Sequence, residues 1–328
     1  MRPHSVLVIG ARNCGKTSFI RFLQQSLSPK QRGIPEEPAP VPAQTGENAG
    51  FKPTYIETEI DGERVGVTLW DSAGLEKSIV DLQLRETVGF IESKFEETFS
   101  EETKVVRAPG VRDTHIHCVF LLLDPARLTP TNHYLGKMGN AEDVGGLDPD
   151  LDTSVLKALH GKTVVVPVVS KADTCTSKHM EHLKQLVRKG LAAAGEDPLE
   201  PLELEADTDG DDAGNRGSLL EVDEEYMASD SDEYPAAAPA VARGGISAGL
   251  NFIPLSVISP DSYDEGEPLG RHFPWGFADP YDENHCDFSR LKDSVFVEWR
   301  AELREKSREN WYENWRSERL GPTERRRR

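Results

Sequence analysis

The sequence has 328 residues and a formal net charge of −19, and it is long enough to bury one large core or two modest ones. Residues 196–233 hold sixteen acidic residues against one basic residue, so −15 of this charge belongs to a single segment. The remaining −4 argues against a nucleic-acid-binding fold, and the apolar runs are too short for a membrane span or a signal peptide.

The four cysteines are far apart in the sequence, and no pair has the C-x-x-C spacing of a metal or redox site. We therefore expect free thiols and a cytosolic protein with a reducing environment. The cysteines are Cys14, Cys118, Cys175 and Cys286. Cys14 has two interpretations, a reactive thiol or a small filler residue.

The first predicted elements are a buried strand over residues 6–9 and a helix that begins at Thr17. Residues 10–17, GARNCGKT, fit the pattern G-x-x-x-x-G-K-[ST], whose backbone amides wrap a phosphate at a helix N-terminus. In this interpretation Lys16 reaches the β- and γ-phosphates, and Thr17 is a ligand of Mg²⁺. An ordinary glycine turn is the alternative. The other expected phosphate-binding residues are Gly10, Asn13, Cys14, Gly15 and Ser18.

The elements that follow alternate between strands and helices. We expect a mobile proline-rich loop over 28–50, a β-hairpin of strands 55–60 and 64–70, and a long helix over 79–104. Two dense apolar strands follow at 116–124 and 162–170, with helices at 151–160 and 177–194, and a weaker strand lies at 251–259. This alternation predicts a three-layer α/β fold with a mostly parallel central sheet.

The acidic segment interrupts this pattern. Residues 196–247 combine charge with alanine, proline and glycine, and we expect them to be disordered. The stretch SDSDE at 229–233 is a candidate for phosphorylation by an acid-directed kinase.

Two short motifs follow apolar strands and indicate the nucleotide. DSAG at 71–74 places Asp71 where it can hold Mg²⁺ through water, and it places the Gly74 amide where it can meet a γ-phosphate. SKAD at 170–173 places Lys171 over a base and Asp173 at its edge. A carboxylate there accepts hydrogen bonds from N1 and N2 of guanine, and adenine lacks that donor pair. A solvated helix cap is the alternative for the second motif.

GARNCGKT, DSAG and SKAD resemble the G1, G3 and G4 motifs of GTP-binding proteins, and the flanking stretches resemble septins. Three stretches carry this likeness: VGFIESKFEETFSEETKVVRAPGVRDTHIHCVFLLLDP (88–125), GRHFPWGFADPYDENHCDFSRLKDSVF (270–296) and ENWYENWRSERL (309–320). The resemblance implies a P-loop NTPase three-layer sandwich followed by a helical septin unique element. It divides the chain into a G domain (1–260), the unique element with its terminal helix (261–320) and a basic tail (321–328).

The same resemblance implies roles for further residues. Arg271 would lie against the guanine base, and the backbone near Ser259 would border the same pocket. Trp275 would lie at a nucleotide-side interface between subunits, with core burial as the alternative. A second interface would use the terminal helix, so septin partners, filaments, a cytoskeletal location, and a role in septation or polarised growth are all implied.

The chain departs from septins at several positions. Septins carry glycine where this chain has Asn13 and Ser259, although asparagine tolerates a positive φ. No heptad repeat follows the last predicted helix. Arg325–Arg328 form the one basic run that suggests weak peripheral membrane contact, with a solvated tail as the alternative.

Hydrolysis depends on an oriented water, which GTPases commonly position with glutamine directly after D-x-x-G. This chain has Leu75 there. Thr54 is the best candidate for a catalytic and Mg²⁺-binding threonine, and Thr45 is a weaker rival. We therefore expect a weak GTPase at most. The alternatives to a septin-like assembly protein are a monomeric switch GTPase, a nucleotide or small-molecule kinase, and a scaffold that no longer binds nucleotide.

Overall fold

A computed structural model describes residues 2–28, 50–60, 62–104, 113–129, 145–202, 252–263 and 268–324. Within these ranges the core is a six-stranded sheet whose strands are parallel except for β2 at one edge. In spatial order the strands are β2 (Phe51–Ile60), β3 (Glu63–Ser72), β1 (Arg2–Gly10), β4 (Cys118–Leu123), β5 (Val164–Val169) and β6 (Leu255–Ser256). The predicted mostly parallel α/β sheet is confirmed.

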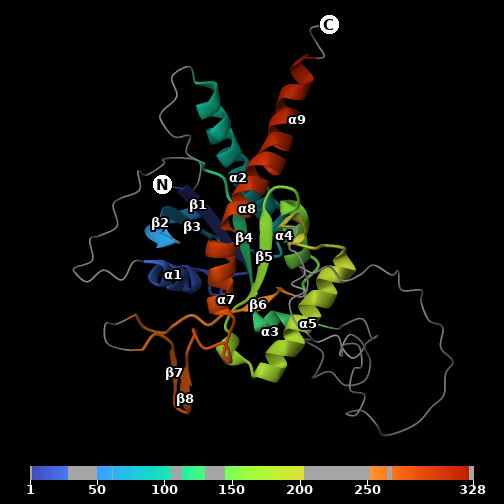
Figure 1. The fold of residues 1–328 in the computed structure, drawn as a ribbon. Helices are drawn as coiled ribbons and strands as arrows, with labels where there is room; N and C mark the ends of the chain where they lie inside the picture. Colours follow the sequence, from blue (N-terminus) through green and yellow to red (C-terminus); the bar gives the residue numbers. More distant parts are fainter. Residues whose placement is uncertain are drawn as a thin grey trace, which may run out of the picture.

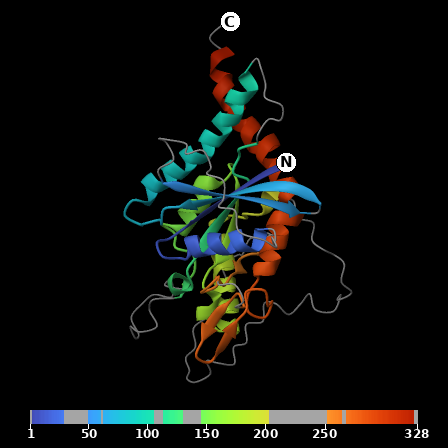
Figure 2. The same ribbon diagram turned by 90° about the vertical axis from the view of Figure 1, so that its left-hand side faces the viewer.

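Helices cover both faces of the sheet (Figures 1 and 2). The helices of the described residues are α1 (Lys16–Leu27), α2 (Val80–Thr103), α3 (Pro125–Leu128), α4 (Asp152–Leu159), α5 (Ser177–Ala194), α7 (Phe288–Asp293), α8 (Arg300–Lys306) and α9 (Glu313–Glu324). The register places Trp70 of β3 and Phe120 of β4 on opposite faces. Phe90 of α2 packs edge-on against Trp70 and Phe19 of α1 packs against Phe120, so α1 and α2 form separate layers.

The sheet explains where a ligand would bind. β1 lies in the middle, with β3 on one side and β4 on the other, so the chain connections leave it in opposite directions. Open α/β sheets bind ligands at such a switch point, beyond the carboxyl ends of the strands. The phosphate-binding loop begins at that end of β1, where the strand runs into Gly10.

The last helices form an almost continuous rod. Two π-helical turns, η5 (Ser294–Glu298) and η6 (Ser307–Tyr312), join α7, α8 and α9. Figures 1 and 2 show α9 beside the end of α2, both projecting past the sheet on the side away from the β7–β8 hairpin (Arg271–Phe273 and Gly276–Ala278). The hydroxyl of Tyr312 donates to Glu102 at 2.8 Å, which fastens the rod to α2.

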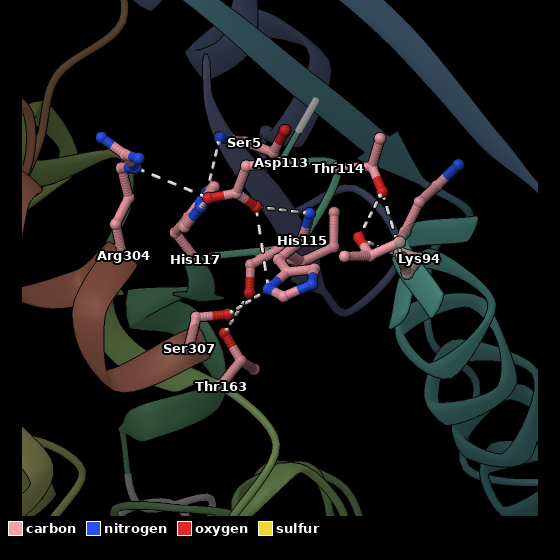
Figure 3. Close-up of polar contacts among 11 residues, drawn as sticks. Ser5, Lys94, Asp113, Thr114, His115, His117, Thr163, Arg304 and Ser307 are labelled. Atoms are coloured by element: carbon pink, nitrogen blue, oxygen red, sulfur yellow. Dashed lines mark hydrogen bonds and ion pairs between the residues drawn. The ribbon is translucent and has the colours of Figure 1, made fainter. Parts of the chain in front are cut away.

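A buried polar cluster fastens the same rod to the sheet (Figure 3). His117 accepts the Ser5 amide through Nδ1 at 3.0 Å, so its Nε2 donates to Asp113 at 3.1 Å. Arg304 of α8 lies 3.5 Å from the same carboxylate, and His115 Nδ1 lies 3.2 Å from the Ser307 hydroxyl. These contacts place titratable groups beneath the terminal helices.

Several predicted boundaries differ from the structure. β1 begins at Arg2 rather than at residue 6, and β2 begins at Phe51 rather than at residue 55, so Thr54 lies inside the strand. The strand expected over 251–259 is much shorter. It pairs with β5 only at Leu255 and Ser256, which lie opposite Val168 and Val169. The acidic segment was expected to begin at 196, yet residues 196–202 are part of the fold. Leu199 and Leu202 are both 1% exposed, and the 3₁₀ turn η3 (Glu200–Leu202) presents the second of them to the core.

Several expectations lie outside the described residues: most of the 28–50 loop with Thr45, the acidic segment from 203 onward, and Arg325–Arg328. Within the described part of the chain, no helix is long and apolar enough to span a bilayer.

Candidate functional site

The phosphate-binding loop has the backbone shape that its pattern requires. Gly15 has φ 93° and Asn13 has φ 63°, so the loop uses one glycine and one asparagine in the left-handed region. A Cβ on Gly10 would lie 2.5 Å from the Leu122 carbonyl oxygen, which is why the strand must end in glycine. Asn13 adopts its left-handed conformation without needing glycine at this position.

Lys16 is buried at the centre of this loop. Its ammonium donates to the carbonyl oxygens of Gly10 at 3.2 Å and Ala11 at 2.9 Å. Cys14 packs beside it, and burial raises the pKa of the Cys14 thiol. Because a raised pKa leaves little thiolate at neutral pH, the filler interpretation of Cys14 fits this environment better than a reactive thiol.

Thr17 and Asp71, two of the residues predicted to hold Mg²⁺ next to the phosphates, lie in contact with each other. The Thr17 hydroxyl donates to Asp71 Oδ2 at 2.7 Å, and Asp71 Oδ1 is buried with no hydrogen-bond partner in the described structure. A hydroxyl and a carboxylate oxygen with free accepting capacity are the hard oxygen donors that Mg²⁺ takes, together with phosphate and water. The residues present therefore fit a phosphate-bound Mg²⁺.

Asp173 lies in a 3₁₀ turn, η2 (Ala172–Thr174), directly after β5. Its side chain is 2% exposed; Oδ2 accepts from Arg271 at 2.8 Å, and the buried Oδ1 has no hydrogen-bond partner among the described residues. Burial raises the pKa of Asp173, although the charge of Arg271 opposes this shift. A buried carboxylate oxygen without a donor is costly, so this position is suited to a ligand that donates hydrogen bonds.

Lys171 and Arg271 surround that carboxylate. Lys171 has φ 53°, and its ammonium donates to Asp124, which follows β4 and caps α3, at 2.6 Å. Arg271 bridges two carboxylates, because its Nε donates to Asp261 at 2.9 Å. The Ala172 amide donates to Val257 O at 3.1 Å, which brings the half-buried Ser259 segment beside this turn.

The last two predicted site residues are Gly74, in the D-x-x-G segment, and Thr54, in the edge strand β2. Gly74 lies against the phosphate-binding loop, where an added Cβ would be 2.7 Å from the Arg12 Cα. Thr54 lies within the edge strand β2 opposite Leu69, two residues along the ladder from the pair that contains Asp71. Its catalytic and Mg²⁺-binding roles stay predictions.

Trp275 lies in the turn between β7 and β8 and is 83% exposed, stacked on Phe273 at 5.3 Å between ring centroids. Core burial, the alternative interpretation, is therefore wrong. Asp173, Phe273 and Trp275 share the lining of one cavity of about 540 Å³ between this hairpin and α5. The guanine-binding candidate and the exposed tryptophan are thus parts of one continuous surface.

Three residues of the site were given no role by the sequence motifs. Asp124 pairs with Lys171, Asp261 holds Arg271, and Arg12 contacts Glu76 after D-x-x-G. Asp124 alone had a sequence signal, since it ends an apolar strand and precedes Pro125 as a helix cap.

This fold and this grouping of loops define a P-loop GTPase-type α/β domain. Comparison with known proteins identifies the family. The model of the family described as Septin matches residues 3–221 and 249–328, and the chain therefore belongs to the septin family.

Individual septins are similar to the chain at low identity over most of its length. The septin homolog spn6 of Schizosaccharomyces pombe is 24% identical over 318 residues, which cover 96% of this chain and 70% of that protein. Septin-1 of Bos taurus is 26% identical over 320 residues, which cover 95% and 72%.

Solved structures show the same fold. The septin GTPase domain from Chlamydomonas reinhardtii superposes with a TM-score of 0.57 at 18% identity, and it covers 96% of this chain and 98% of its own. Cdc11 from Saccharomyces cerevisiae gives a TM-score of 0.50 at 14% identity, with 97% and 100% covered.

Proposed function

We propose that this septin binds GTP or GDP with Mg²⁺ and uses the bound nucleotide to shape a surface for assembly with other septin subunits. The observation that carries the proposal is Asp173 Oδ1, a buried carboxylate oxygen that has no hydrogen-bond donor among the described residues. It lies beyond the carboxyl end of β5, two strands away from β1, which leads into the phosphate-binding loop. Guanine supplies the N1 and N2 donors that this carboxylate lacks.

The phosphates would be held at the other end of the nucleotide. The amides of Asn13 to Ser18 surround the N-terminus of α1, where the helix dipole also favours negative charge. Lys16 would exchange its two carbonyl acceptors for oxygens of the β- and γ-phosphates. Mg²⁺ neutralises phosphate charge when it is bound, and Thr17 with Asp71 would hold it.

We further propose that GTP hydrolysis is slow or does not occur. Leu75 stands where GTPases commonly carry a water-orienting glutamine, and it is 4% exposed. Its side chain has no group that orients water. Thr54 is the remaining candidate for that task, and it lies in the edge strand rather than in the phosphate-binding loop.

Assembly would use two surfaces at opposite ends of the molecule. One contains Trp275 and the cavity beside Asp173, so nucleotide binding and subunit contact would be coupled. The other contains α9 (Figure 1). Filament formation with other septins, a cytoskeletal location at the septum or cell cortex, and a role in cytokinesis or polarised growth follow as family-based proposals, and Arg325–Arg328 stay a candidate for weak membrane contact.

Lys16→Ala tests both nucleotide binding and nucleotide-dependent assembly. The variant should bind GDP at least about 100-fold more weakly, because it loses the charged hydrogen bonds to the phosphates. Its far-ultraviolet circular dichroism should match that of the unchanged protein. In light scattering, GDP should support dimers or longer assemblies of the unchanged chain and not of the variant.

Full GDP affinity in Lys16→Ala would show that the phosphate site is misplaced. A strictly monomeric wild-type chain that turns over GTP at switch-like rates with an activator would instead favour the monomeric GTPase class. Phosphate transfer to a second substrate would favour a kinase.

A further inference from the structure

An ion pair lies between the two ends of the proposed nucleotide site. Lys171 follows β5, and its ammonium donates at 2.6 Å to Oδ2 of Asp124, which follows β4. β4 lies between β5 and β1, and β1 leads into the phosphate-binding loop. The Lys171 side chain therefore runs along the carboxyl edge of the sheet, from the strand that precedes Asp173 toward the strand that precedes the loop.

The charges of this ion pair act on the phosphate-binding loop. Burial raises the pKa of the Cys14 thiol; the charge of Lys16 opposes this shift, and the charges of Asp124 and Lys171 act on the same thiol in opposite directions. β1 and β5 are two strand spacings apart, which is about 10 Å. A nucleotide held by Lys16 at one end and by Asp173 at the other must cross the end of β4, where it lies beside the Lys171 side chain.

Asp124 is itself held in place by local structure. It caps α3, because its Oδ1 accepts the Ala126 amide at 3.0 Å and its main-chain carbonyl accepts the Arg127 amide at 2.9 Å. Its side chain is 15% exposed, against 35% for Lys171. Lys171 also has a φ of 53°, a conformation that a residue other than glycine keeps only where its surroundings fix it. An ordered carboxylate thus restrains a long side chain that has many rotamers when it is free.

We propose that Asp124 is a positioning residue for the guanine site: it fixes the Lys171 side chain through the ion pair, so that the stem of this lysine forms a wall of the base pocket before the nucleotide arrives. The inference rests on the proposed guanine-nucleotide function and extends it to a residue outside the three sequence motifs. A side chain that is ordered in advance loses less conformational entropy on binding, so the ion pair favours affinity. The ammonium also neutralises the Asp124 charge, which would otherwise repel the phosphates.

A double-mutant cycle on GDP binding tests this role, with Mg²⁺ and the full-length chain. Asp124→Asn removes the charge and keeps an oxygen that can cap α3, and it should weaken GDP binding about 5-fold because Lys171 is no longer restrained. Lys171→Met keeps an unbranched stem and leaves the Asp124 charge unpaired, so it should weaken binding about 10-fold. In the Lys171→Met background, Asp124→Asn should no longer weaken binding and should instead restore about 3-fold of the loss. If Asp124 only stabilises α3, its substitution has the same effect in both backgrounds.

Glu92→Gln is the matched control. Glu92 pairs with Lys162 at 2.5 Å just before the opposite end of β5, and that lysine is similarly exposed, at 30%. The control should keep GDP affinity within about 2-fold of the unchanged protein. Asp124→Ser, which also keeps a capping oxygen, repeats the cycle with a second side chain, and thermal unfolding shows that each variant is folded.

Two results separate this role from the nucleotide site itself. If the unchanged protein binds GDP and the Asp124 substitutions have equal effects in both backgrounds, including no effect in either, the positioning role is wrong and the nucleotide site stands. Failure of the unchanged chain to bind GDP would overturn the positioning role and the proposed function together.

Discussion

Replacing Asp173 with asparagine is expected to weaken GDP binding by roughly 100-fold or more and to strengthen the binding of xanthosine diphosphate. A carboxylate accepts from both N1–H and N2–H₂ of guanine, and hydrogen bonds to a charged group contribute about 1.5–3 kcal/mol each. An asparagine amide offers one acceptor and one donor. Xanthine matches that pair, because it carries an N1–H donor beside an O2 acceptor.

Asp261→Asn is the matched control for this exchange of specificity. Asp261 contacts the same arginine from an exposed position, so it can affect the proposed base only through Arg271. The control should change GDP affinity by less than about 5-fold and should not select xanthine. Titration of each variant with both nucleotides measures the exchange, and unchanged GDP affinity in Asp173→Asn would contradict base recognition by this carboxylate.

The second large effect is a loss of folding stability in acid. His115 is buried beneath the terminal helices, and burial lowers its pKa to about 4 from an ordinary value of 6.5. Burial likewise holds the pKa of His4 well below 6.5, with both ring nitrogens unpartnered among the described residues. The pKa of Asp113 is also lowered: burial opposes this, and the hydrogen bond and charge of His117 outweigh it.

The sign of the effect follows from proton uptake. Between pH 6.5 and about 4 the unfolded chain protonates His115 and the folded chain does not, so the free energy of unfolding falls as the pH falls through this window. The full shift corresponds to a loss on the order of 3 kcal/mol at pH 4 from His115 alone. Asp113 contributes in the same direction below pH 3.8, where its unfolded form takes up a proton first.

Urea unfolding at pH 7, 5.5 and 4.5 measures this loss. His115→Gln keeps a polar group near Ser307 but does not titrate, so the decline in unfolding free energy between pH 7 and 4.5 should be smaller by about 2 kcal/mol. His160→Gln makes the same change at a side chain that is 70% exposed, and it should follow the unchanged protein. Equal acid sensitivity in all three proteins would exclude His115 as its cause.

The parts of the site that sequence could predict are those encoded by contiguous residues. The shape of the loop around Lys16 follows from glycine, asparagine and a helix start. Thr17 meets Asp71 because β1, which leads into this loop, and β3, which carries Asp71, are neighbours in the sheet. The place of Asp173 also follows, since parallel strands end at a common edge. These features depend on local pattern and on a simple rule of topology.

The contacts that sequence could not predict join residues far apart in the chain. Arg271 meets Asp173 across 98 positions, and Arg12 meets Glu76 across 64. The cluster that contains His4 and His117 had no motif, because its members are gathered by packing between the sheet and the terminal rod. Leu199 was assigned to the acidic segment, since tertiary burial rather than composition decides its state.

The most direct test of the account is the nucleotide carried by the purified, full-length protein. Heat or acid denaturation followed by ion-exchange chromatography of the supernatant identifies and quantifies what is released. We expect a guanine nucleotide, GTP or GDP, approaching one molecule per chain. Release of an adenine nucleotide at that stoichiometry, or no release together with no binding of added GDP, would contradict the claim that one guanosine phosphate is held between Lys16 and Asp173.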